Sequence, residues 1–167
     1  MIILINNPNK ITSLDVSKSL ALQYLSCSKN LLENLDVSKN TALTYLFCNN
    51  NQLETLDVSQ NTALYDLYCR NNQLKTLDVS ENTKLGRLYC SNNQISVLDM
   101  TNLRNIMDFA CNDNELSVLK LSTSTRFGDL NCQNNHFQLS DLYNLSQKWM
   151  YNYNPYDIVL GTQTLAG

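Results

Sequence analysis

The sequence predicts a solenoid of short, parallel β-strands in which the chain completes one turn about every 21 residues. The first observation behind this prediction is a set of six cysteines at one constant interval, namely Cys27, Cys48, Cys69, Cys90, Cys111 and Cys132. The second is an asparagine column at the same spacing, made of Asn9, Asn30, Asn51, Asn72, Asn93, Asn114 and Asn135. Units of this length bury a core by stacking on their neighbours, so a single solenoid domain is expected.

Each turn contains two strand-like segments. Residues 43–53 read Leu-x-x-Leu-x-Cys-x-x-Asn-x-Leu, and residues 53–61 follow with an offset copy, Leu-x-x-Leu-Asp-Val-x-x-Asn. Both alternate apolar and polar residues, which is the period of a strand. Because so short a turn leaves little room for a helix, we expect parallel strands on the concave face. Short strands or 3₁₀ turns are expected on the opposite face, with the leucine and cysteine columns between them as the core.

Composition excludes several classes of partner. The net charge is −3 and only 16% of the residues are charged, so no basic surface for nucleic acid or an anionic membrane is expected. No apolar run approaches the ~18 residues that a membrane-spanning helix needs, and membrane insertion is not predicted. The apolar opening, residues 1–5, is too short for the core of a signal peptide and follows no cationic segment.

The cysteines are predicted to be free, buried thiols. No Cys-x-x-Cys pair occurs and His136 is the only histidine, so the spacing of a metal site is missing. In a parallel ladder the cysteine side chains all point the same way, which does not suit the geometry of a disulfide. Cysteine is a small apolar residue when it is buried. The sequence therefore indicates a packing role, with no metal and no cofactor.

Two polar columns are expected to stabilise the turns. The asparagines of the ladder from Asn30 to Asn135 are predicted to be buried where each strand ends, because an amide both donates to and accepts from neighbouring turns. The aspartates form a second column, Asp15, Asp36, Asp57, Asp78 and Asp99. A calcium site is the alternative for this column, but one carboxylate per turn is too few for an ion that takes six to eight oxygens. A turn-stabilising column that faces solvent is the preferred interpretation.

The repeat pattern sets the predicted boundaries. The array covers residues 1–136, with about six full turns and a partial turn at the N-terminus. Residues 137–157 are expected to form a C-terminal cap, in which Leu139, Leu142, Leu145 and Trp149 have helical spacing and Ser140 or Asp141 caps the helix. Within it, Trp149–Tyr153 falls one repeat after the preceding strand and is a candidate final strand. Residues 158–167 are either a last strand or a linker.

The beginning of the chain fits half of a repeat, with Asn6 in the cysteine position. Met1–Asn6 is therefore expected to form the first strand. No polar cap precedes it, although solenoids need terminal caps for solubility, and an excised fragment is the favoured interpretation. An unprotected strand edge recruits other strands, so end-to-end self-association through residues 1–20 is expected.

The complete unit resembles a known family. Residues 43–63 read Leu-x-x-Leu-x-Cys-x-x-Asn-Gln-Leu-x-x-Leu-Asp-Val-Ser-x-Asn-Thr-Ala, and residues 64–84 match them nearly throughout. This pattern resembles the leucine-rich repeats of internalin-J-like bacterial surface proteins, and the likeness covers residues 1–136. The ending at residues 150–155, Met-Tyr-Asn-Tyr-Asn-Pro, looks like the tail that closes such arrays. The resemblance implies the α/β horseshoe class, a secreted or cell-surface recognition protein, and no shared catalytic residues.

In this fold the residues on either side of the second leucine of each strand point to solvent on the concave face. There the middle repeats carry aromatic side chains mixed with arginines and aspartates, the residue types of interface hot spots. The predicted ligand-binding residues are Tyr24, Tyr45, Phe47, Asp66, Tyr68, Arg70, Arg87, Tyr89 and Asp108. The alternative is that the aromatics reflect strand propensity and cross-strand stacking alone.

Three functions remain compatible with the sequence. The first is recognition of a protein through the concave face, the second is a glycan-binding adhesin that uses the same aromatics, and the third is a structural spacer. An enzyme is not predicted, because a single histidine with no nucleophile elbow nearby does not assemble a catalytic triad. His136 occupies the position of Gln52, Gln73 and Gln94, and it is interpreted as a variant of that repeat position.

Overall fold

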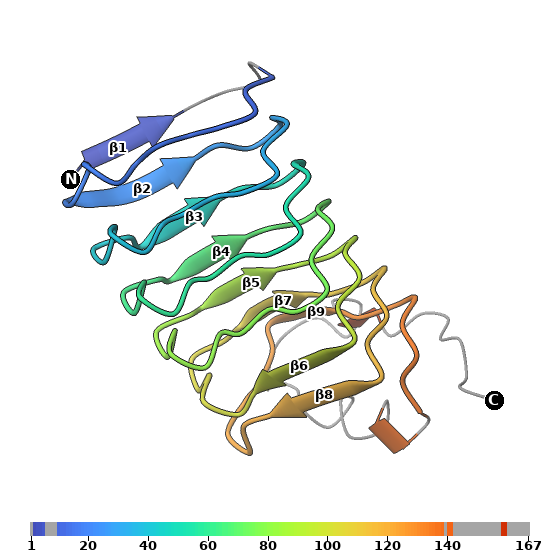
Figure 1. The fold of residues 1–167 in the computed structure, drawn as a ribbon. Coiled ribbons are helices and arrows are strands. Elements are labelled where there is room, and N and C mark those ends of the chain that lie inside the picture. Colours follow the sequence, from blue (N-terminus) through green and yellow to red (C-terminus); the bar gives the residue numbers. More distant parts are fainter. Residues whose placement is uncertain (1, 6–9, 139, 142–157, 160–167) are drawn as a thin grey trace.

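The computed structural model describes residues 2–5, 10–138, 140–141 and 158–159, and these form a parallel-strand solenoid (Figure 1). The main sheet, here sheet A, has the strand order β1-β2-β3-β4-β5-β7-β9-β10, and a second sheet, sheet B, pairs β6 with β8. The strands are β1 (Ile2–Ile5), β2 (Leu22–Ser26), β3 (Tyr45–Phe47), β4 (Asp66–Tyr68), β5 (Arg87–Tyr89), β6 (Val97–Met100), β7 (Asp108–Ala110), β8 (Val118–Leu121), β9 (Asp129–Asn131) and β10 (Ile158–Val159). The predicted fold class is confirmed.

The register of sheet A follows the repeat. Leu46 of β3 pairs with Leu67 of β4, which pairs with Leu88 of β5, so each position meets its equivalent in the next repeat. The same register continues to Phe109 of β7 and Leu130 of β9. Strands of a parallel sheet lie ~4.8 Å apart, so each sequence column becomes a continuous row of side chains.

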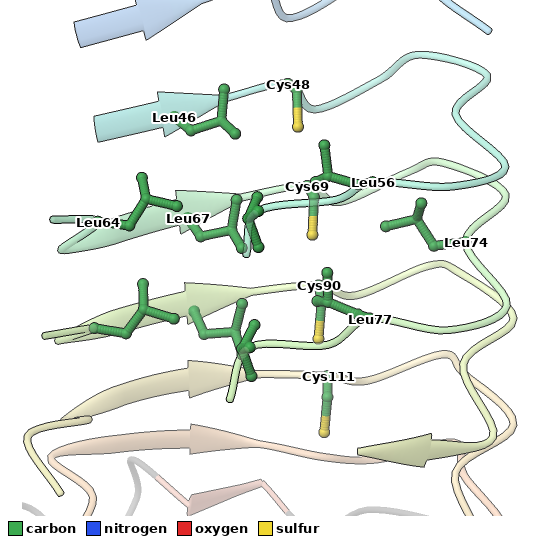
Figure 2. Close-up of a cluster of buried hydrophobic side chains, with 14 of the residues drawn as sticks. Leu46, Cys48, Leu56, Leu64, Leu67, Cys69, Leu74, Leu77, Cys90 and Cys111 are labelled. Atoms are coloured by element: carbon green, nitrogen blue, oxygen red, sulfur yellow. The ribbon is translucent and has the colours of Figure 1, made fainter. Parts of the chain in front are cut away.

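The leucine and cysteine columns form the core between the two faces of the solenoid (Figure 2). The six cysteines are all buried and free, as predicted. Figure 2 shows the thiols of Cys48, Cys69, Cys90 and Cys111 pointing the same way along the stack, which is the geometry that disfavours disulfides. Where the leucines give way to larger residues, the rings of Phe109 and Phe127 stack with their centroids 5.7 Å apart.

The face opposite sheet A is only partly strand. The β-branched Val97 and Val118 lie opposite each other where β6 pairs with β8, and a Lys120–Asp99 ion pair of 3.2 Å joins the same two strands. In earlier turns the equivalent segment closes through tight backbone hydrogen bonds, such as that from the N–H of Asn61 to the carbonyl of Val58 (2.9 Å). Within the described residues, the expectation of short strands on this face is thus met in the last turns alone.

The aspartate column stabilises turns, as predicted. The side chains are exposed, and the Oδ1 of each accepts the backbone N–H two residues later at 2.9–3.0 Å. These hydrogen bonds lower the pKa of carboxylates such as Asp57, because they favour the ionised form. The residues concerned are Asp15, Asp36, Asp57, Asp78 and Asp99.

The two ends of sheet A differ in how well they follow the repeat. At the N-terminal end, Ile2–Ile5 is the predicted first strand, and Leu4 pairs with Leu25 of β2. At the other end, the neighbour of β9 is β10, and Ile158 pairs with Leu130, so the two paired residues are separated by more than one repeat. Ile158–Val159 lies in the segment for which a last strand was one of the two expectations, and the other candidate strand, Trp149–Tyr153, lies outside the described residues.

Most of the predicted cap, with Leu139, Leu142, Leu145 and Trp149, lies outside the described residues, as does Asn9. Ser140 and Asp141 are helical. The carboxylate of Asp141 accepts the N–H of Gln138 at 3.3 Å.

One column adopts the left-handed backbone conformation, with φ between 54° and 60°. It comprises Lys10, Lys29, Asn50, Asn71, Asn92, Asp113 and Asn134. Asparagine and aspartate tolerate this region because their short side chains bond locally, whereas a lysine is strained there.

We therefore predict that Lys29→Asn raises the free energy of unfolding by about 0.5–1 kcal/mol, because it relieves this strain. The measurement is chemical denaturation of both chains. Lys39→Asn is the matched control, since Lys39 is equally exposed but is not left-handed. An equal gain in the control would trace the effect to charge and not to the backbone.

Candidate binding face

Two rows of side chains project from sheet A on either side of its central leucines. In the first row Tyr24, Tyr45, Asp66, Arg87, Asp108 and Asp129 follow one another in register. In the second row the order is Ser26, Phe47, Tyr68, Tyr89, Ala110 and Asn131. The nine predicted ligand-binding residues all belong to these rows or, for Arg70, lie just beyond the end of β4. We call these nine residues the aromatic face.

The rings of the aromatic face pack on one another across four turns. The ring centroids of Tyr24 and Phe47 are 5.2 Å apart, those of Phe47 and Tyr68 4.7 Å, and those of Tyr68 and Tyr89 4.5 Å. The last two pairs meet edge to face, at interplanar angles of 76° and 70°. Tyr45 lies beside this row, 6.1 Å from Tyr24. Such pairs stabilise one another, so the rings form a preorganised surface.

A row of alternating charges runs beside the rings. Arg87 donates from Nη1 to Asp66 Oδ2 at 3.1 Å, and its Nε lies 3.3 Å from Asp108 Oδ2. The Arg87 and Asp108 side chains are 42% and 30% exposed, whereas that of Asp66 is only 5% exposed. Burial raises the pKa of Asp66, and the nearby Arg87 opposes that rise. Asp66 holds Arg87 in place and raises the pKa of its guanidinium.

Arg70 is the exposed cation of this face. Its guanidinium lies 5.5 Å from the centre of the Tyr89 ring, within the range of a cation–π contact. Its backbone N–H donates to the Oδ1 of Asn49 at 2.9 Å, which ties the Arg70 backbone to the neighbouring turn. Burial raises the pKa of Tyr89 to about 12.

Two expectations for this face need correction. The aromatic side chains were expected to be exposed, but all five are half-buried, because rings on adjacent turns cover one another. Asp66 was expected to face solvent, but the residue is 3% exposed. Its Oδ1 is buried and has no hydrogen-bond partner among the described residues. Asp66 is thus a support for Arg87 and not a direct contact for a ligand.

Beneath the face, the asparagine ladder ties each turn to the one before. In the middle of the array, Nδ2 of Asn72 donates to the carbonyls of Cys48 (3.1 Å) and Cys69 (2.9 Å). Its Oδ1 accepts the N–H of Leu53 at 3.1 Å. Asn93 is half-buried, and the other described members of the ladder are buried. These are the bonds between turns that the sequence predicts for this column.

The asparagine that ends the second half of each repeat was identified from the sequence, but its role in a second buried ladder was not. Asn40, Asn61 and Asn82 are fully buried, and Nδ2 of Asn61 donates to the carbonyls of Val37 (3.0 Å) and Asn40 (2.9 Å). The repeat spacing was a signal for it, although the column is short. Sequence reasoning also overlooked Tyr65, whose ring lies so close to Gly86 that a Cβ there would come within 2.6 Å of it. The two residues are one repeat apart, so the period places them on adjacent turns, but it does not show that the ring lies over the glycine.

A solved structure with the same kind of cysteine column resembles this chain. The functional domain of InlJ from Listeria monocytogenes, which includes a cysteine ladder, aligns with 81% of this chain at 42% identity and a TM-score of 0.75. The chain is a cysteine-ladder leucine-rich-repeat solenoid. The chain spans 30% of the length of that structure. His136 keeps a repeat position of that array, because its N–H bonds the carbonyl of Leu116 (2.8 Å) as that of Gln73 bonds Leu53.

Two further structures share the fold of this leucine-rich-repeat solenoid. A leucine-rich-repeat protein of Leptospira interrogans aligns with 87% of the chain at 22% identity and a TM-score of 0.69, and the chain covers 46% of it. The internalin inlF from Listeria monocytogenes aligns with 80% at 24% identity and a TM-score of 0.61, and the chain covers 42% of it. No protein-family profile and no curated protein matches the sequence.

The similar structures support the general role of a protein-interaction scaffold for this chain. None of them indicates a family of enzymes. In the described part of the chain, no helix has the length and apolar character needed to cross a bilayer. In the same residues, no three His, Cys, Asp or Glu side chains gather as a metal site would require.

Proposed function

We propose that this leucine-rich-repeat array recognises a protein partner through the aromatic face of sheet A. The observation that carries the proposal is the continuous row of packed rings next to the charged triad of Asp66, Arg87 and Asp108. Tyrosine and arginine in rigid surroundings lose little conformational freedom on binding, which is why they dominate interface hot spots. The resemblance to InlJ extends the proposal to a secreted or cell-surface protein.

The orientation of the rings favours a protein over a glycan. Sugars stack on an open aromatic face, but here Phe47, Tyr68 and Tyr89 meet edge to face with centroids 4.5–4.7 Å apart. Each ring edge therefore lies against the face of its neighbour, which reduces the aromatic surface on which a sugar ring could stack. A protein side chain or backbone segment can instead pack across the tops of several rings.

Charge adds selectivity to this surface. Arg87 already forms ion pairs with two carboxylates, so it is not a free cation for a partner. Arg70 has no carboxylate partner among the described residues and is exposed. A partner that places an acidic group over Arg70 and an apolar group over Tyr68 satisfies both features at once.

The proposal is tested by probing a protein array and a glycan array with four versions of the chain. These are the parent, Tyr68→Ser, Arg70→Ser, and the double variant Glu54→Ser/Lys75→Ser as a control outside sheet A. We expect protein ligands that the parent and the control retain. The two face variants should weaken them at least roughly tenfold, the effect of losing one hot-spot residue.

Arg70→Ser guards against misfolding, since Arg70 is exposed and its removal leaves the core intact. Ligands that are all glycans would favour the adhesin alternative. Protein ligands that ignore both face variants but are lost in the control would exclude this face.

A further inference from the structure

The repeat changes at the corner of the solenoid where each strand of sheet A begins. In the regular turns this corner reads Asn-Thr-Ala or Asn-Thr-Lys, at residues 40–42, 61–63 and 82–84. The next two turns read Leu-Arg-Asn at 103–105 and Ser-Thr-Arg at 124–126. The second asparagine ladder therefore ends at Asn82, and arginines appear where the array otherwise carries a threonine, an alanine or a lysine.

The irregular corner opens into a pocket. Its volume is about 330 Å³, and it is lined by Arg104, Asn105, Ile106, Met107, Ser124 and Arg126. Leu103, which replaces the ladder asparagine, is fully buried and has no polar group to bridge the turns. The fold explains the residues that recur in every repeat. It does not explain Arg104 and Arg126, which differ from the repeat pattern, line the same pocket and add nothing to the packing of the core.

Neither arginine is neutralised by the protein itself. The ion pairs among the described residues involve Arg87 and Lys120, and neither Arg104 nor Arg126 forms one. The acidic residues of the whole chain outnumber its basic ones by 15 to 12, so carboxylates are not scarce. Two like charges in one pocket repel each other, and a bound anion removes that repulsion.

Arg126 is also fixed in position. Its Nη1 donates to the carbonyl of Thr125 at 2.7 Å and to that of Thr123 at 3.3 Å. These bonds hold the guanidinium over its own turn, and the fork of a guanidinium has further N–H groups to offer an acceptor. Arg104 approaches the same pocket from the preceding turn.

We infer that this pocket, lined by Arg104 and Arg126, is a binding site for a tetrahedral oxyanion, a sulfate or phosphate group. A carboxylate has two oxygens in one plane and matches a single guanidinium fork. A tetrahedral ion presents acceptors in several directions, so each of two guanidiniums on different turns takes its own oxygens. Ser124 and Asn105 supply further polar groups beside them.

The site is distinct from the aromatic face. Met107 of its lining immediately precedes β7, so the pocket opens at the edge of sheet A where the strands begin. It stands on its own observations and does not depend on the proposed function. An ester of the same anions, carried by a larger partner, presents the same oxygens as the free ion.

The test is calorimetric titration of the full chain with sodium sulfate and sodium phosphate, at ionic strength held constant with chloride. We expect saturable binding that Arg104→Gln and Arg126→Gln each weaken roughly tenfold, the loss expected for one charge-assisted hydrogen bond. Lys84→Gln is the matched control, because Lys84 is exposed, stands two turns before Arg126 in the same column and carries the same charge. It should change the affinity less than about twofold.

Titration with acetate and with O-phosphoserine distinguishes the possible sources of the anion. Binding of the phosphate ester shows that the pocket accepts a substituted group, and binding of the inorganic ions alone identifies a free-ion site. Acetate binding as tight as sulfate would overturn the tetrahedral assignment. An equal loss in Lys84→Gln, or no saturation with any ion, would overturn the site altogether. Denaturation of each variant checks the fold. Both arginines are exposed, and Arg104→Gln is the safer variant because Arg126 also donates to backbone carbonyls of its own turn.

Discussion

Replacing Asn72 by alanine is expected to lower the free energy of unfolding by about 3 kcal/mol, because buried groups lose their partners. The N–H of Leu53 is left without its acceptor, and the carbonyls of Cys48 and Cys69 each lose one donor. Each carbonyl keeps its other asparagine, so the orphaned N–H is the largest single loss. Chemical denaturation followed by circular dichroism measures the change.

Gln73→Ala is the control, since Gln73 is the exposed neighbouring amide and its removal should change stability by less than about 0.5 kcal/mol. Asn135 makes the same set of bonds as Asn72, to Cys111, Cys132 and Leu116. It lies beside the less regular last turns, so Asn135→Ala should shift the denaturation midpoint less. A loss at Asn72 no larger than at Gln73 would mean that the ladder does not hold the turns together.

Stability is also expected to fall steeply above about pH 9, because the unfolded thiols ionise there and the buried ones do not. Burial raises the pKa of Cys27, Cys69 and Cys132 to about 12, and it raises that of Cys48, Cys90 and Cys111 well above the ordinary value of a thiol. A group whose pKa is raised on folding contributes its full stability below the unfolded pKa and loses it as the pH rises towards the folded one. Each such thiol removes about 1.4 kcal/mol per pH unit in that window.

Denaturation midpoints between pH 7 and pH 11 test this expectation. Cys69→Ala should make the loss of unfolding free energy with pH less steep by the contribution of one thiol. The same thiols should react slowly in the native protein, since a pKa of about 12 reduces the thiolate fraction roughly 10³-fold. In denatured protein without reductant, all six thiols should react with the thiol reagent. Recovery of two or fewer would mean disulfides, and would contradict the cysteine packing.

The parts of the fold that repeat were predictable from sequence, since a column fixes one environment many times over. Cys69 shares its place with five other cysteines, so its burial and free state follow from the period. The positions that break the period were predictable only in part, since a last strand within residues 158–167 was one of two expectations but its register was not. Asp66 falls in a surface row, yet it is buried, with Tyr45 and Arg87 as its neighbours in the sheet. The strand β10 lies out of step with the repeat, because more than one repeat length of chain separates it from its partner β9.

The candidate sites were also predictable only in part. The row of Phe47, Tyr68 and Tyr89 could be placed on one face from spacing alone, but the ring orientations that favour a protein partner depend on side-chain packing. The pocket of Arg104 and Arg126 required knowing that the corner opens where the second ladder ends. The change to Leu103-Arg104 is visible in the sequence, although its spatial consequence is not.

The ladder bonds have a consequence for how such a chain changes length. The bonds made by Asn72 span 3, 19 and 24 residues, and those made by Asn61 span 21 and 24. None of them reaches beyond an adjacent turn. Removing or duplicating one repeat unit within the regular array therefore rejoins every ladder with an equivalent partner.

What such a change alters is the order of side chains along the aromatic face. Excision of residues 64–84 would bring Tyr45 opposite Arg87 and Phe47 opposite Tyr89, because each position keeps its register with the repeat that follows. The same step removes Tyr68 and takes the Asp66 carboxylate away from Arg87. Gene rearrangement in whole units can thus rewrite the recognition surface while the interior stays the same.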